Sequence, residues 1–228
     1  MPLKTISPER SFDSYAKVRA WVGNLVRIRR FQLRRRGVPS KVYLDIGCGP
    51  NTHGTFINLD YFWRPGVDVC WDITRGLPFG DASMRGIYSE RCLEHFSVAE
   101  ASGIFREGRR VLSPGGIFRV IVPDADMYLR TYVSQLGGGT SDRFPFQEAE
   151  SKDANWTPLQ SVNRVFYQDR ESPFGHRTMY DYSMLRKLLE NCGFSRVARC
   201  GFQNGRDPLL LIDSPERSVE SLYVEATP

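Results

Sequence analysis

Short apolar runs alternate with stretches of helical periodicity along most of this chain. Four compact runs, each broken by glycine, proline or aspartate, predict short buried strands at residues 41–46, 56–60, 67–71 and 85–89. The run Ile117 to Val122 is the most strand-like in the chain, and it ends at a proline. Two more strands are predicted near residues 196–200 and 222–225.

Helical spacing fills three of the intervals between and before these strands. Ser97 with Glu100 three residues later forms a capping-box pattern, which predicts a helix that ends at Val111-Leu112, before Ser113-Pro114-Gly115-Gly116. A second helix is predicted from Ser183 to Gly193. Residues 14–33 carry apolar side chains at steps of three or four with arginines on the other faces, which predicts an amphipathic helix.

Strands that alternate with helices favour an α/β sandwich around a mostly parallel sheet. The sequence then divides into a basic N-terminal helix at 1–40 and one domain at 41–228. Residues 124–181 form a long stretch without clear periodicity, which we interpret as an irregular insertion between the fifth strand and the last helix.

Charge is distributed unevenly in this 228-residue chain of net charge +5. Residues 1–41 hold eleven lysines and arginines against two acids, a net +9, and the remainder carries a net −4. This basic segment could meet nucleic acid or an anionic membrane surface, although we do not favour either partner.

Apolar runs and cysteines bear on the location of the protein and on its metal chemistry. No apolar run approaches the about 20 residues of a membrane span, and no signal peptide is evident, so we predict a cytoplasmic protein. Five scattered cysteines without a C-x-x-C pair predict neither a zinc site nor a disulfide framework.

The chemistry concentrates after the first predicted strand, in the turn Asp45-Ile46-Gly47-Cys48-Gly49-Pro50. A dinucleotide fingerprint would need a third glycine where Thr52 stands. A phosphate-binding P-loop would need a lysine after Gly54, where Thr55 stands. A phosphate-free nucleoside cofactor, S-adenosylmethionine, remains.

Carboxylates end four successive predicted strands, as that cofactor would require. Asp60 could accept hydrogen bonds from ribose hydroxyls, and Asp72 could meet an adenine amino group. Asp45 and Glu90 complete the set. Each acid alone is more simply a cap or a turn residue, but all four would meet at one edge of a parallel sheet, where such folds bind ligands.

With these motifs the chain resembles the class I S-adenosylmethionine-dependent methyltransferases of the broad type 11 group. The matching motifs are Leu44 to Pro50, Asn58-Leu59-Asp60, Asp72 to Phe79, Leu93-Glu94-His95, Val111 to Gly116 and, loosely, Leu188 to Phe194. The resemblance is strong over residues 41–124 and loose over 176–226. It implies a Rossmann-like fold with an antiparallel last strand, and it implies cofactor binding by Asp45, Gly47, Cys48, Gly49, Asp60, Tyr61, Asp72, Ile73 and Glu90.

One departure from the group lies between the first two strands. Only residues 51–55 separate the glycine turn from the second strand, which is too short for the usual crossover helix. We therefore expect a loop there and a more open methionine end of the cofactor site, which residues 14–36 could cover.

Three histidines are candidates for proton transfer or acceptor orientation. His95 follows the fourth strand and is the leading candidate for catalysis. His176, in Gly175 to Asp181, is the second, because the resemblance puts this segment near the mouth of the site. His53 is nearest to the expected methionine end and has the weakest case.

The acceptor is not evident from the sequence. We expect an oxygen or nitrogen nucleophile of a small molecule or a glycan-type acceptor, where "glycan" rests on relatives with a similar His176 to Tyr180 pattern. Nine aromatic residues in the insertion predict either a substrate cap or a satellite hydrophobic cluster. The alternatives are a nucleic-acid methyltransferase, a non-catalytic cofactor-binding protein and, third, a nicotinamide oxidoreductase.

Overall fold

The computed structural model describes residues 42–139, 143–147, 152, 156–166 and 175–228, together with Val18, Trp21, Val22 and Leu25. Those four N-terminal residues are helical. The rest of the predicted basic helix, and with it the expected cover from residues 14–36, lies outside the described residues. No helix among the described residues is long and apolar enough to cross a lipid bilayer.

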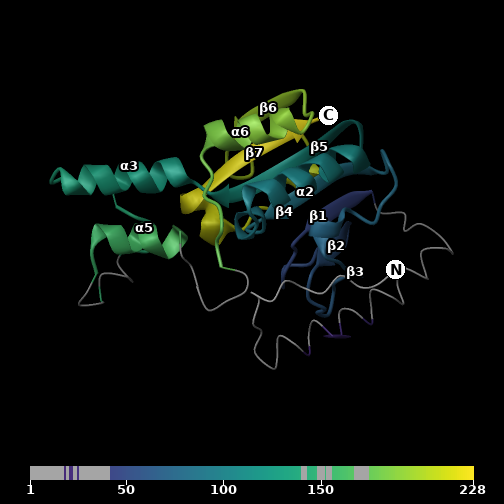
Figure 1. The fold of residues 1–228 in the computed structure, drawn as a ribbon, viewed down its shortest axis with the longest axis horizontal. Coiled ribbons are helices and arrows are strands. Elements are labelled where there is room, and N and C mark those ends of the chain that lie inside the picture. Colours follow the sequence, from purple (N-terminus) through teal and green to yellow (C-terminus); the bar gives the residue numbers. More distant parts are fainter. Residues whose placement is uncertain are drawn as a thin grey trace.

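A seven-stranded sheet organises the described chain (Figure 1). Its order is β3-β2-β1-β4-β5-β7-β6, and β7 alone runs in the direction opposite to the other six strands. The predicted α/β architecture with an antiparallel last strand is therefore confirmed. The strands are β1 (Tyr43–Ile46), β2 (Phe56–Asp60), β3 (Val69–Cys70), β4 (Met84–Glu90), β5 (Leu112–Pro123), β6 (Arg196–Cys200) and β7 (Ser221–Thr227).

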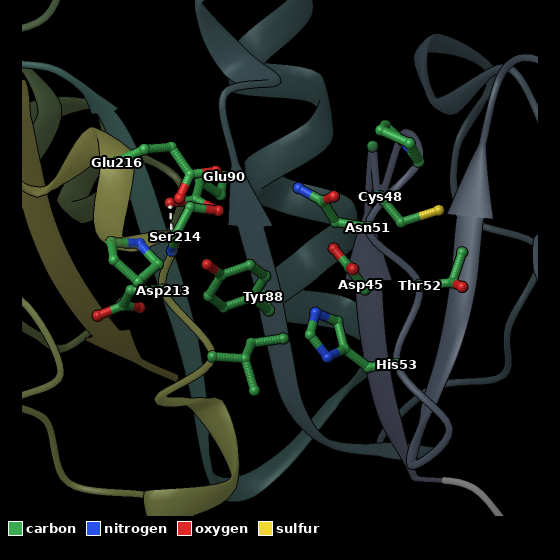
Figure 2. Close-up of a pocket in the computed structure, with 14 residues that line it drawn as sticks. Asp45, Cys48, Asn51, Thr52, His53, Tyr88, Glu90, Asp213, Ser214 and Glu216 are labelled. Atoms are coloured by element: carbon green, nitrogen blue, oxygen red, sulfur yellow. Dashed lines mark hydrogen bonds between the residues drawn. The ribbon is translucent and has the colours of Figure 1, made fainter.

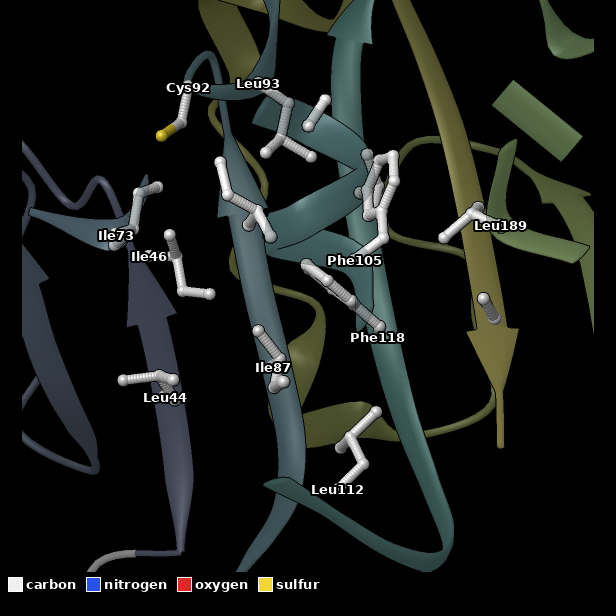
Figure 3. Close-up of a cluster of buried hydrophobic side chains, with 14 of the residues drawn as sticks. Leu44, Ile46, Ile73, Ile87, Cys92, Leu93, Phe105, Leu112, Phe118 and Leu189 are labelled. Carbon is white, nitrogen blue, oxygen red and sulfur yellow. The ribbon is translucent and has the colours of Figure 1, made fainter. Parts of the chain in front are cut away.

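Two helices, α2 (Val98–Val111) and α6 (Tyr182–Asn191), cover one face of the sheet (Figure 1). The predicted capping box is present at the start of α2, where Ser97 and Glu100 each bond the other's backbone. Alternation along the strands separates the two faces of the sheet. Side chains such as Leu44, Ile87 and Phe118 meet Phe105 and Leu189 of the helices in the main core (Figure 3).

Alternate positions on the same strands point to the opposite face. There Tyr43, Phe56, Tyr88, Ile121 and Tyr223 belong to a smaller cluster. A segment after β6, which contains the short 3-10 helix η4 (Pro208–Leu210), adds Leu210 to this cluster. The two faces therefore differ, with α-helices on one and an irregular segment on the other.

The prediction of an irregular insertion at 124–181 was wrong in part. The structure forms α3 (Ala125–Leu136), capped by Asp124, and α5 (Pro158–Phe166) within it. The two helices lie side by side beyond the sheet (Figure 1) and share a hydrophobic cluster of Tyr128, Phe144, Val162 and Val165. Their buried side chains belong to this separate cluster and not to the main core of the sheet.

The expected short crossover is present. The chain passes from β1 to the parallel strand β2 through residues 47–55, with turns and no helix. Asn58, buried in β2, stabilises this loop because its amide accepts from the His53 backbone N–H at 2.8 Å and donates to the His53 carbonyl at 3.0 Å. The loop therefore has fixed anchor points although it lacks a helix.

Candidate active site

Two cavities open at the carboxyl ends of β1, β2 and β4, and Gly47 lines both. The Asp45 cavity, of about 410 Å³, is lined by Asp45, Gly47, Cys48, Pro50, Asn51, Thr52, His53, Tyr88, Glu90 and residues 212–216 (Figure 2). The Asp60 cavity, of about 300 Å³, is lined by Gly47, Gly49, Leu59, Asp60, Tyr61, Phe62, Arg64, Trp71, Asp72, Ile73, Arg91, Cys92, His95 and Phe96. Together they form a two-part cleft on either side of the glycine turn.

The turn depends on glycine at position 47. Its φ is +74°, a conformation that favours glycine, and its N–H donates to the Leu59 carbonyl at 2.8 Å. A Cβ there would lie 2.4 Å from the Sγ atom of Cys92. The backbone of β1 thus passes close to the residues that follow β4, and this contact separates the two cavities.

In the Asp60 cavity the carboxylates are held by the backbone. Asp60 accepts from the Gly49 N–H at 2.9 Å and from the Phe62 N–H at 2.8 Å. Asp72 caps the 3-10 helix η2 (Ile73–Arg75) and accepts from the Thr74 N–H. Each carboxylate oxygen has more than one lone pair, so these acids can hold the local chain and still accept from a ligand.

In the Asp45 cavity the carboxylate of Asp45 is crowded by other acids and has fewer hydrogen-bond donors than that of Asp60. Asp45 is 3% exposed, and no hydrogen bond to its side chain is recorded among the described residues. Burial, and then the neighbouring charges of Glu90 and Asp60, raise the pKa of Asp45 well above its ordinary value. Burial and Glu90 likewise raise the pKa of the Tyr88 phenol. A cation placed here would relieve this crowding of negative charge.

Glu90 is already engaged by the chain. Its Oε1 accepts from the Ser214 N–H at 3.1 Å and its Oε2 accepts from the Ser214 hydroxyl at 2.6 Å (Figure 2). Glu90 therefore lines the cavity but also anchors the segment that forms its far wall.

That wall was missed by sequence reasoning. Residues 212–216 reach the site because Asp213 pairs with Arg119 of β5 through two bonds of 2.8 and 2.6 Å, with both side chains fully buried. Arg119 also lies 3.2 Å from Glu225, its cross-strand neighbour on β7. The signal was available, because an arginine inside the most apolar strand requires buried acidic partners.

The third part of the site is a corner formed by His95, His176 and Glu94. His95 ends the 3-10 helix η3 (Leu93–His95) and lines the Asp60 cavity. The His176 ring meets it edge-on with 5.0 Å between ring centroids. Burial lowers the pKa of His176, and this outweighs the opposite effect of the Glu94 carboxylate.

Glu220 connects the insertion to the cleft. Tyr128 of α3 and Arg91, which lines the Asp60 cavity, both donate to Glu220, which lies at the end of the 3-10 helix η5 (Pro215–Glu220). Arg91 has a φ of +54°, an uncommon conformation for a residue other than glycine. The α3–α5 pair is thus anchored beside the cleft, although most of its aromatic side chains pack against one another.

The structure brings nearly all the predicted site residues together. Every predicted cofactor-binding residue lines one of the two cavities, and so do His95 and His53. His176 lines neither, and it reaches the cleft only through its contact with His95. The side chain of Cys48 packs with Val67 and Cys70, so it is the turn backbone at position 48 that is available to a ligand.

Comparisons with known proteins bear on this geometry. Residues 63–120 match the family described as the methyltransferase domain. No curated protein matches the sequence significantly. This match lies inside the stretch where the resemblance was predicted to be strong, so the predicted relation to S-adenosylmethionine-dependent methyltransferases is confirmed there. It includes Asp72, Ile73, Glu90 and His95 but not the glycine turn.

Two solved methyltransferases are similar to this chain at low identity. An S-adenosylmethionine-dependent methyltransferase from Archaeoglobus fulgidus is 15% identical, with 95% of this chain and 100% of that chain covered and a TM-score of 0.49. One from Thermotoga maritima is 17% identical, with 93% and 94% covered and a TM-score of 0.45.

Proposed function

From the premise that this chain is an S-adenosylmethionine-dependent methyltransferase, we propose that it methylates an oxygen or nitrogen atom of a small-molecule or glycan-type acceptor. The observation that carries the proposal is the two-part cleft, in which His95 stands at the edge beyond β4. A histidine there can meet an acceptor group that approaches the cleft.

The residues of the cleft fit the cofactor. Asp60 and Asp72 offer carboxylate oxygens to hydroxyl and amino groups on one side of the glycine turn, and Trp71 and Ile73 supply apolar contact. On the other side the uncompensated carboxylate of Asp45 suits the ammonium group at the amino-acid end. When bound, S-adenosylmethionine supplies an activated methyl group, and the protein supplies position and electrostatics.

Position is the largest contribution that the protein can make. Holding a nucleophile in line with a reacting centre contributes about 7–11 kcal/mol in favourable cases. His95 is the residue of this chain placed to orient the acceptor or accept its proton, and the partly exposed side chain allows either role. Tyr88 stays protonated because its pKa is raised, so we do not assign it the role of a base.

A glycan-type acceptor is favoured over a nucleic acid by two features. The segment His176 to Tyr180, on which the expectation of a glycan-type acceptor rests, lies beside His95, with the Thr178 hydroxyl bonded to the Phe96 carbonyl at 2.8 Å. The described lining of the two cavities carries two arginines, Arg64 and Arg91, against ten acidic or hydroxyl-bearing residues. The ten are Asp45, Thr52, Asp60, Tyr61, Asp72, Tyr88, Glu90, Asp213, Ser214 and Glu216. Such a surface disfavours a phosphate backbone.

A methyl-transfer assay with three acceptor panels tests the proposal. We expect turnover with hydroxylated small molecules or saccharides and none with RNA. His95→Gln should lower kcat at least about tenfold, because general acid–base groups contribute about 10²–10⁴-fold. Its affinity for S-adenosylhomocysteine should stay within a few fold of wild type. Turnover on RNA alone, or an unchanged kcat in the variant, would contradict the proposal.

A further inference from the structure

The corner beside the cleft contains a group of side chains that the methyl-transfer site does not explain. Glu94, His95 and His176 each place one potential ligand atom within 4.8 Å of the others. Glu94 and His95 come from η3, and His176 comes from the segment before α6. Two imidazoles and one carboxylate are thus collected from distant parts of the chain.

Glu94 is the least satisfied residue of the three. It is fully buried, and neither of its carboxylate oxygens has a hydrogen-bond partner among the described residues. Its backbone carbonyl, by contrast, accepts from the N–H groups of Arg177 at 2.8 Å and Thr178 at 3.1 Å. The segment that carries His176 is therefore tied to Glu94, while the charge of Glu94 lacks a donor. Leaving a buried carboxylate uncompensated is strongly unfavourable.

The orientation of His176 is that of a metal ligand. Its Nδ1 lies 2.6 Å from the Val165 carbonyl of α5. A carbonyl only accepts, so Nδ1 carries the hydrogen and Nε2 is free to act as a ligand. Nε2 is the atom that faces Glu94, at 3.9 Å from Oε1. Metal-bound histidines commonly donate their other ring N–H to a backbone carbonyl in this way.

His95 completes the set from the side of the cleft. Its Nδ1 is buried and has no hydrogen-bond partner among the described residues. The neighbouring cations Arg177 and Arg91 pair with other acids, Glu100 and Glu220. Among the described residues, the Glu94 carboxylate and the His95 Nδ1 atom thus have no hydrogen-bond partner, and both residues lie against the His176 ring.

We propose that Glu94, His95 and His176 bind a divalent transition-metal ion of the zinc class. Two imidazole nitrogens and one carboxylate oxygen suit such an ion, and three protein ligands leave a coordination position open. Zinc bonds of about 2.0–2.2 Å would draw the three ligand atoms closer together than they now lie. The site uses no cysteine, which is why cysteine spacing could not predict it. The site does not depend on the identity of the methyl acceptor.

Metal titration of the untagged full-length protein after treatment with a chelator tests this site. We expect one equivalent of Zn²⁺ by calorimetry, and Co²⁺ should give visible d–d absorption without a thiolate charge-transfer band. Glu94→Gln and His176→Ala should each weaken Zn²⁺ binding at least about tenfold, since even outer partners of metal ligands are worth 10–100-fold. His53→Ala is the matched control, because His53 is the one histidine outside the cluster, and it should bind Zn²⁺ as the wild type does.

A loss of Zn²⁺ binding can be distinguished from a folding defect. If Glu94→Gln does not fold, His176→Ala decides the question alone, and its circular dichroism and S-adenosylhomocysteine affinity should match those of wild type. Absence of stoichiometric binding in the wild type would overturn the site. Equal Zn²⁺ affinity in wild type and His176→Ala would also overturn it. So would a thiolate charge-transfer band with Co²⁺, because it would show that cysteines bind the ion.

Discussion

Gly47 lines both cavities of the cleft, yet the two cavities hold Asp45 and Asp60 in opposite ways. Asp60 accepts two backbone N–H groups, so its carboxylate is held in place before any ligand arrives. Asp45 is buried beside Glu90 and Asp60, and its ionised form is disfavoured until a cation arrives. One side of the cleft is thus preorganised for neutral hydroxyl and amino groups, and the other is arranged to gain from positive charge.

The largest expected effect comes from the residue that separates the two cavities. Gly47→Ala would put a Cβ 2.4 Å from the Cys92 Sγ at a φ of +74°. The conformation costs about 1–2 kcal/mol, and overpacking typically adds about 1–3 kcal/mol. We expect S-adenosylhomocysteine affinity, measured by calorimetry, to fall about a hundredfold or more, which corresponds to about 2.7 kcal/mol.

Gly49→Ala is the matched control for this change. Gly49 also has a positive φ, of +54°, but an added Cβ there would meet no atom within 4 Å. It should therefore show the backbone strain alone and a smaller loss of affinity. Equal losses in the two variants would mean that the contact with Cys92 does not shape the cleft.

How far the sequence predicts this region depends on how local the interactions are. The strand-end acids, the capping box at Ser97 and the missing crossover helix follow from neighbouring residues, and each was predicted. The far wall at Asp213-Ser214 was missed because it depends on a pairing with Arg119 from a distant strand. Likewise, α3 and α5 were read as irregular because they bury their apolar faces mainly against each other.

A second substitution should separate affinity from stability. Burial raises the pKa of Asp45, so the folded protein retains a proton in a pH range where the unfolded chain has released it. Stability therefore falls as the pH rises from the ordinary Asp value of about 3.9 through the raised value. Asp45→Asn removes this penalty and should raise Tm at neutral pH, with the difference disappearing below about pH 4. Its affinity for S-adenosylmethionine should fall about tenfold or more.

Asp60→Asn should differ from Asp45→Asn in its effect on stability. The amide retains only one acceptor oxygen for the two N–H groups of Gly49 and Phe62. Hydrogen bonds to charged groups contribute about 1.5–3 kcal/mol, so this variant should lose stability and affinity together. Thermal melts from pH 4 to pH 8 measure both variants. A lower Tm for Asp45→Asn at neutral pH would contradict the assignment of a strained carboxylate.

The smallest expected effect tests whether the wall of the Asp45 cavity is held by Glu90. Ser214→Ala removes the hydroxyl bond to Glu90 at 2.6 Å but keeps the backbone N–H bond at 3.1 Å. The loss should be about 1 kcal/mol in chemical denaturation, with little change in S-adenosylhomocysteine affinity, because Arg119 still fixes Asp213 next to it. Pro215→Ala, at the neighbouring position, is the control for a general loosening of the segment. If Ser214→Ala weakened S-adenosylhomocysteine binding as strongly as Gly47→Ala does, the wall at residues 212–216 would itself contact the ligand. The outcome would contradict a purely structural role for the Ser214–Glu90 bond.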